Sequence, residues 1–138
     1  NGLHELWLTI KLRMHLIRFI AMEKKYLRDY QAPVYTVEQT VLNFQLDKDS
    51  TVVRAVYHMK KNSNSDQPLV LDGEDMILRD LRINGVALSK QAYAITDNHL
   101  TIPNIVDDTF VLECEVIIVP KDNTMLSGLY VSGDCLCT

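Results

Sequence analysis

From residue 34 onward, apolar side chains recur at every second position, and this alternation constrains the fold more than any other feature. It runs through residues 42–46, 53–59 and 110–118, where mostly polar or smaller side chains occupy the positions in between. Because neighbouring side chains of a β-strand point to opposite faces, the pattern predicts strands with one wetter face. The first two stretches flank DKDS at residues 47–50. That composition is typical of a turn, so the pair predicts an antiparallel hairpin.

The first of these strands, expected over Val34–Leu46, changes phase along its length. The alternation through Val37 and Val41 is out of step with the later one through Leu42 and Phe44. A β-bulge adds one residue to a strand and so reverses which side chains face inward. We therefore expect a bulge or a twist between Val41 and Leu42.

Turn signals divide the rest of the chain into short pieces. Asn84-Gly85 is the strongest short hairpin signal that a sequence offers, and Asp97-Asn98 marks a second tight turn. Further strands are expected at residues 69–71, 76–83, 86–88, 93–96 and 99–102. Many short strands with regular turns predict an all-β fold, either an antiparallel sandwich or an open pair of sheets.

Residues 1–25 differ from this pattern and predict an amphipathic helical extension ahead of a β-rich domain over residues 26–138. Their apolar residues recur at steps of three and four: Leu3, Leu6, Trp7, Ile10, Met14, Ile17 and Ala21. Charged side chains interrupt the run, which excludes a membrane-spanning helix and a signal peptide. Three interpretations stay open: a helix packed on its own domain, an extension upstream of a start at Met22, or a basic helix on a membrane surface.

Charge and cysteine content narrow the class of partner and the compartment. Residues 1–28 carry six basic and two acidic side chains, a net +4, whereas residues 29–138 carry eight basic and sixteen acidic, a net −8. Nucleic-acid binding depends on clustered Lys and Arg, so an acidic body argues against it, and no membrane is expected as a partner. Three cysteines make no disulfide framework, which favours the cytoplasm.

No catalytic centre is evident in the sequence. The four histidines include no H-E-x-x-H pair, Cys135 and Cys137 form C-x-C and not C-x-x-C, and no G-x-S-x-G surrounds a serine. The acidic run DGED at residues 72–75 lacks the twelve-residue ligand spacing of an EF-hand and is interpreted as a β-turn. Any chemistry must therefore come from residues outside this chain, and neither a metal nor another cofactor is predicted within it.

The last stretch, residues 127–138 (SGLYVSGDCLCT), is glycine-rich and predicts neither a regular helix nor a regular strand. Two further short motifs precede it, residues 30–35 (YQAPVY) and 71–75 (LDGED). The order and the spacing of these motifs along the chain make the combination specific. From Tyr26 to Thr138 the chain resembles the N-terminal domain of bacterial aminopeptidase N, a zinc metallo-aminopeptidase of the gluzincin type.

The resemblance implies a saddle-like β-domain that packs on the catalytic domain of the same chain and helps shape the pocket for a peptide substrate. The family's zinc and general base belong to later motifs, G-x-M-E-N and H-E-x-x-H, which are not in these residues, so zinc is expected only in a longer parent. The domain is then incomplete at its C-terminus, just before a Q-C-E segment. Gly128, Tyr130, Ser132 and Thr138 would lead toward the substrate pocket, or pack between domains.

Two other functions stay open beside this one. The chain could be a stand-alone β-sandwich interaction module without catalytic activity. It could also be a membrane-surface adaptor that uses residues 3–21.

Overall fold

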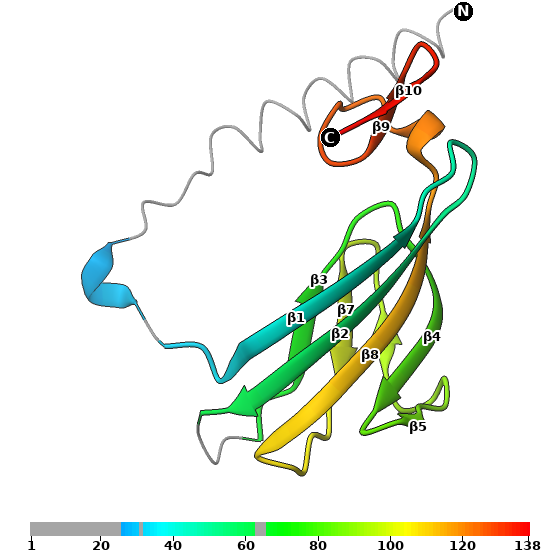
Figure 1. Ribbon diagram of the computed structural model, residues 1–138. Helices are drawn as coiled ribbons and strands as arrows, with labels where there is room; N and C mark the ends of the chain where they lie inside the picture. The colour runs from blue at the N-terminus through cyan, green and yellow to red at the C-terminus, as the bar shows by residue number, and fades with distance from the viewer. Residues whose placement is uncertain (1–25, 31, 63–65) are drawn as a thin grey trace, which may run out of the picture. The chain divides into compact units, whose positions relative to one another are not determined.

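A computed structural model describes residues 26–30, 32–62 and 66–138 (Figure 1). The chain divides into two compact units, Asn1–Ala32 and Pro33–Thr138. In the first unit the described residues include one 3₁₀ turn, η1 (Leu27–Asp29). The predicted amphipathic helix over residues 1–25 lies outside the described residues. The strands and the candidate site belong to the second unit.

The described residues of the second unit form three antiparallel sheets, which confirms the all-β prediction. The main sheet has the order β1-β2-β8-β4-β5, the second has β3-β7-β6, and β9 and β10 form a hairpin. The main strands are β1 (Tyr35–Gln45), β2 (Thr51–Lys61), β8 (Thr109–Ile118), β4 (Ile77–Ile83) and β5 (Val86–Ala87). The second sheet comprises β3 (Leu69–Asp72), β7 (His99–Ile102) and β6 (Ala94–Ile95). The hairpin comprises β9 (Tyr130–Ser132) and β10 (Cys135–Cys137), after the 3₁₀ turn η2 (Pro120–Asp122).

The hairpin of β1 and β2 forms as predicted, and local hydrogen bonds close its turn. The Asp47 carboxylate accepts from the backbone N–H groups of Asp49 at 2.8 Å and Ser50 at 3.0 Å. The buried Thr51 hydroxyl accepts from Asp47 N at 2.9 Å and donates to Asp47 O at 2.6 Å. The side chains of Asp47 and Thr51 therefore satisfy the backbone groups that the turn exposes.

The phase change in β1 is real, but its predicted position was wrong. The register shifts between Val37 and Gln39, which leaves Glu38 as the extra residue. Val37 faces Met59 before the bulge, and Leu42 faces Ala55 after it, so both point to the inner face. Val41 pairs with Val56 on the outer face, although its apolar side chain had suggested an inward position.

The Asn84-Gly85 turn also forms as predicted and joins β4 to β5. Both residues have positive φ, 51° and 77°, as a two-residue hairpin of this kind requires. The Asn84 side chain accepts from Val111 N at 2.9 Å, which ties the turn to β8. One prediction for the end of the chain was wrong: residues 130–137 form the regular hairpin β9–β10, because Gly133, at φ 58°, supplies its turn.

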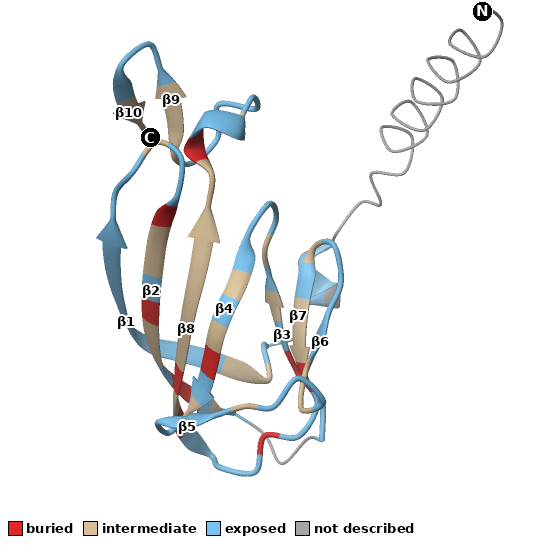
Figure 2. Cartoon of the chain, turned by 90° about the vertical axis from the view of Figure 1, so that its right-hand side faces the viewer, coloured by how far each residue is buried: buried red, intermediate tan, exposed pale blue. Residues whose placement is uncertain are grey.

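The core lies between the inner face of the main sheet and the second sheet, toward the end where β2 finishes and β8 begins (Figure 2). Its buried members are Met59, Leu69, Leu81, Ile102, Ile105, Phe110 and Leu112. Tyr35 packs edge-to-face on Phe110 with ring centroids 6.2 Å apart. At the opposite end, where β2 starts and β8 finishes, the two sheets are not closed by a comparable cluster of buried side chains among the described residues.

Candidate functional site

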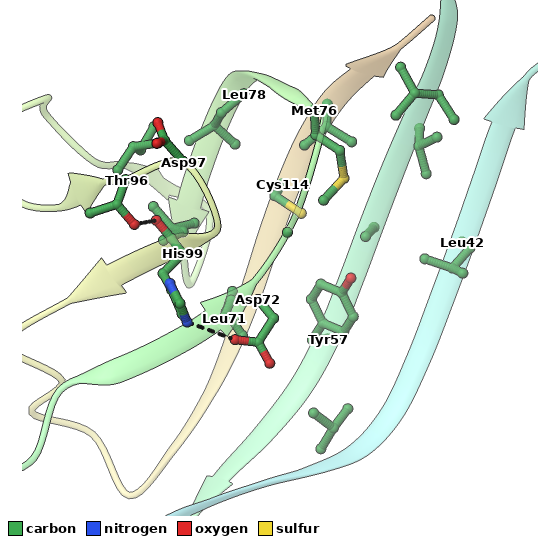
Figure 3. Close-up of a pocket in the computed structure, with 18 of the residues that line it drawn as sticks. Leu42, Tyr57, Leu71, Asp72, Met76, Leu78, Thr96, Asp97, His99 and Cys114 are labelled. Carbon is green, nitrogen blue, oxygen red and sulfur yellow. Dashed lines mark hydrogen bonds and ion pairs between the residues drawn. The ribbon is translucent and has the colours of Figure 1, made fainter. Parts of the chain in front are cut away.

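An apolar hollow of about 470 Å³ opens between the two sheets, beyond the closed core (Figure 3). Leu42 of β1, Tyr57 of β2 and Cys114 of β8 line it from the main sheet. Leu71 and Leu100 line it from the second sheet. Within each sheet these residues lie on the face that is turned toward the other sheet. They do so because β-strand side chains alternate and the antiparallel register aligns the inward positions of neighbouring strands.

Polar side chains occur at the rim of the hollow, on the second sheet. His99 Nε2 lies 3.3 Å from Asp72 Oδ1, a pairing that Figure 3 marks with a dashed line. Both side chains are at least half exposed, so water screens this pair and it contributes little to stability. Asp72 begins the acidic run 72–75, in which the chain bends at Glu74 and Asp75 between β3 and β4. Gly73 N donates to Asn98 O at 3.0 Å.

Two titratable side chains of the main sheet, Cys114 and Tyr57, line the hollow. Burial raises the pKa of the Cys114 thiol, and burial together with the neighbouring Cys114 raises the pKa of the Tyr57 phenol. Both groups are thus kept in their neutral form at neutral pH, and a protonated thiol is a weak nucleophile. Such a hollow is suited to binding apolar side chains.

The described residues do not fit a zinc ion. Over 26–30, 32–62 and 66–138, no three His, Cys, Asp or Glu side chains come together as a group that could hold a metal. A structural or catalytic zinc requires three or four such ligands. Within the same ranges, no helix is long and apolar enough to cross a membrane.

The four residues predicted from the resemblance to lie near the substrate pocket gather on the β9–β10 hairpin and not in the hollow. Tyr130 pairs with Cys137, next to Thr138, and Ser132 pairs with Cys135 at the turn end. Gly128, at φ 76°, precedes β9 in a left-handed conformation that glycine adopts without strain. The structure brings these residues to one hairpin, while their role toward a substrate stays a prediction.

The hairpin follows the end of β8 and lies near the β1–β2 turn (Figure 1). Lys121 Nζ lies 2.6 Å from Asp49 Oδ1, and Lys48 Nζ lies 3.4 Å from Asp134 Oδ1, so both ion pairs connect this region to the β1–β2 turn. The pair with Lys121 lowers the pKa of the Asp49 carboxyl.

Sequence reasoning missed the hollow altogether. The alternation of Leu42, Phe44 and Tyr57 predicts strands with one wetter face, and this pattern does not distinguish a filled core from a hollow. That Cys114 lies opposite Leu71 and Leu100 depends on how two sheets face one another, which no local pattern specifies.

Known proteins resemble this chain in sequence over most of its length. No family model matches the chain. Aminopeptidase N of Escherichia coli strain K12 is 40% identical over 116 residues, which are 84% of this chain and 13% of that protein. Aminopeptidase N of Haemophilus influenzae is 35% identical over 114 residues, again 13% of its length. The resemblance to the N-terminal domain of bacterial aminopeptidase N is confirmed.

Solved structures are similar to this chain in fold. Legionella pneumophila aminopeptidase A, solved in complex with aspartic acid, matches with a TM-score of 0.67 and 32% identity over 78% of this chain and 13% of that one. An M1 zinc metallopeptidase of Deinococcus radiodurans shares the fold, with a TM-score of 0.50 and 13% identity over 63% of this chain and 21% of that one. The chain spans only about an eighth of the E. coli and H. influenzae aminopeptidase N proteins.

Proposed function

We propose that this chain is the non-catalytic N-terminal domain of a cytoplasmic, zinc-dependent aminopeptidase that removes N-terminal amino acids from peptides. We call that longer protein the parent. The observation that carries the proposal is the 40% identity with E. coli aminopeptidase N over 84% of the chain. The domain packs on the catalytic domain of the parent and helps to shape its substrate pocket.

The apolar hollow supports the packing. Leu42 and Phe44 line it and remain about half exposed in this chain. Fully burying a side chain of this size stabilises a protein by about 1.5–3 kcal/mol, so covering both would be a substantial gain. The exposed surface also predicts that the isolated chain aggregates, since uncovered apolar patches and long edge strands promote association.

Zinc belongs to the catalytic domain in this proposal, because the described residues of this chain offer no ligand group for it. In the family the ion polarises the scissile carbonyl and activates water. The present chain contributes shape alone. It therefore hydrolyses no peptide and binds no stoichiometric zinc when it is purified by itself.

The β9–β10 hairpin is the part of the domain that we assign to the approach of the substrate pocket. A two-stranded hairpin is marginally stable in water by itself. Tyr130, Val131 and Leu136 are only half-buried in it. Contact with the parent's remaining chain would complete their burial, and Gly128, Ser132 and Thr138 would then lie along the same route.

Thiol accessibility tests the packing. Cys114 lines the hollow and Cys135 is exposed on the hairpin, so one alkylation experiment followed by mass spectrometry reads both. We expect a maleimide to label Cys114 in this chain under native conditions and to label it far more slowly in the parent. Denatured parent gives the reference rate for each thiol. Equal labelling of Cys114 in the native and denatured parent would show that nothing covers the hollow.

Activity tests the assignment to an aminopeptidase. The open reading frame that contains this chain should continue into H-E-x-x-H, and the parent should hydrolyse an alanine–nitroanilide substrate in a chelator-sensitive way. A stop codon directly after Thr138, with a monodisperse and cooperatively unfolding chain, would instead favour the stand-alone interaction module.

A further inference from the structure

The side chain of Asn123 makes two hydrogen bonds across the loop between η2 and β9. The Asn123 amide Nδ2 donates to Ser127 O at 2.8 Å and to Leu129 O at 2.9 Å. These two acceptors lie on either side of Gly128, and the loop from residue 124 to residue 127 is thereby closed on itself. Leu126 is within this closed loop.

Leu126 has an unfavourable backbone conformation. Its φ is 55°, in the left-handed region, where the Cβ of an L-residue crowds the following carbonyl oxygen. Gly128, two residues later, has a φ of 76° and avoids that crowding because it has no Cβ. The loop thus requires left-handed backbone twice and has glycine at only one of the two positions.

The exposure of the apolar Leu126 side chain to water is also unfavourable. Its side chain is 65% exposed, and the adjacent Met125 is 81% exposed. Asparagine would tolerate the same φ and would prefer water. A leucine here therefore gains nothing from its local surroundings, neither from its backbone conformation nor from burial. Strained residues of this kind cluster at active sites, ligand clamps and switch regions.

We propose that Met125 and Leu126 form an apolar contact tip that inserts into an apolar recess on the part of the parent against which this domain packs. The inference rests on the proposed function. The surface that the tip contacts belongs to the parent's own chain. About seven eighths of the E. coli and H. influenzae relatives lie outside the matched region, so such a parent has ample further chain to provide it. The tip also lies in the chain between the end of β8 and the two-stranded β9–β10 hairpin.

Oxidation of Met125 by dilute hydrogen peroxide, followed by mass spectrometry, tests the tip in the native parent. Oxidation follows exposure, so we expect Met125 to react about tenfold or more slowly in the parent than in a synthetic peptide of residues 119–130. Met59, which is 3% exposed, gives the buried limit within the same molecule. A Met125 that reacts at the peptide rate in the parent would refute the tip.

The 138-residue chain alone serves as the second reference. Rapid oxidation of Met125 there, with slow oxidation in the parent, supports a contact made by the parent. Slow oxidation in the chain alone would overturn the proposal: if it depends on concentration, it assigns the tip to a second copy, and otherwise to a contact within these residues.

Substitutions at Leu126 separate contact from strain. Leu126→Met keeps an apolar side chain and the unfavourable φ, whereas Leu126→Asn relieves the strain and removes the contact. In the parent we expect the thermal midpoint of Leu126→Met to stay near that of wild type, and that of Leu126→Asn to fall and its Met125 to become oxidisable. An Asn variant at least as stable as wild type, with Met125 oxidised no faster, would place Leu126 in water and overturn the proposal.

The two proposals fail separately. Aminopeptidase activity of the same preparation reports on the proposed function, whereas Met125 protection reports on the tip. An active parent with unprotected Met125 refutes the tip alone. An inactive parent with protected Met125 refutes the enzymatic assignment and leaves the tip as a contact with the rest of that chain.

Discussion

Leu112 is the residue on which the closed end of the core depends most. It is fully buried on β8 and pairs with Tyr57 of β2 and Ile83 of β4. Because β8 is the central strand of the main sheet, the side chain meets neighbours on both sides as well as the second sheet. Leu112→Ala is therefore the substitution that most directly tests the packing of the two sheets.

The expected loss of stability can be estimated from the atoms removed. Leucine to alanine deletes three carbon atoms, and at about 0.8 kcal/mol for each buried group this amounts to roughly 2.4 kcal/mol. The cavity left behind raises the cost to about 3–4 kcal/mol, since a β-sheet core relaxes only partly. A domain of this size has a free energy of unfolding of about 5–15 kcal/mol, so the variant would lose a large share of it.

Urea unfolding followed by circular dichroism measures this loss. Val106→Ala is the matched control, because Val106 is 89% exposed and should change the free energy of unfolding by about 0.5 kcal/mol or less. If the two variants unfold at the same urea concentration, Leu112 does not lie in a closed core, and the packing of β8 against the second sheet is refuted. If the isolated chain aggregates, the same pair of variants can be compared in the parent.

Three further predictions concern single groups. Gly85→Ala should destabilise the chain by about 1 kcal/mol in the same urea assay, because φ at this position is 77° while no atom obstructs an added Cβ; an unchanged midpoint would contradict the left-handed turn. Burial raises the pKa of Cys114, so the native state holds this proton more tightly than the unfolded chain. Its stabilising contribution is full below about pH 8.5 and is lost as the pH rises through the folded pKa. Cys114→Ala should therefore flatten the alkaline fall in stability, and an equally steep fall would refute this cause. Lys121→Met should raise the pKa of Asp49 toward its ordinary value, since the Lys121 hydrogen bond is the main cause of its lowering; an NMR titration that finds the same pKa in both proteins would exclude that pair as the cause.

The bulge in β1 shows where prediction from sequence reached its limit. The alternation before Val37 and after Leu42 is out of step, so one extra residue had to lie between them. The prediction treats Val41 as inward and so places the bulge after it, whereas an outward Val41 allows the bulge at any position from 38 to 40. The pairing with β2 decides the question, because Val37 faces Met59 and Gln39 faces His58, with Glu38 left over. That pairing is a property of two strands and is invisible in one.

The candidate site divides in the same way. The glycine-rich stretch that carried the resemblance to aminopeptidase N was visible in the sequence, because a short motif consists of residues that are close together in the chain. The hollow was not visible, since Leu42, Cys114 and Leu100 are far apart in the chain and meet only when two sheets face each other. The strained Leu126 was equally hidden, because nothing in a leucine signals a positive φ.

By itself, the sequence determined the all-β class, the hairpins at residues 47–50 and 84–85, and the resemblance to the N-terminal domain of aminopeptidase N. These features depend on side-chain alternation, on turn chemistry and on short motifs, all of which act between near neighbours in the chain. The tertiary structure alone decided that the core closes at one end and leaves an apolar hollow at the other. Burial depends on which distant strands face one another, and that is settled by packing and not by local preference.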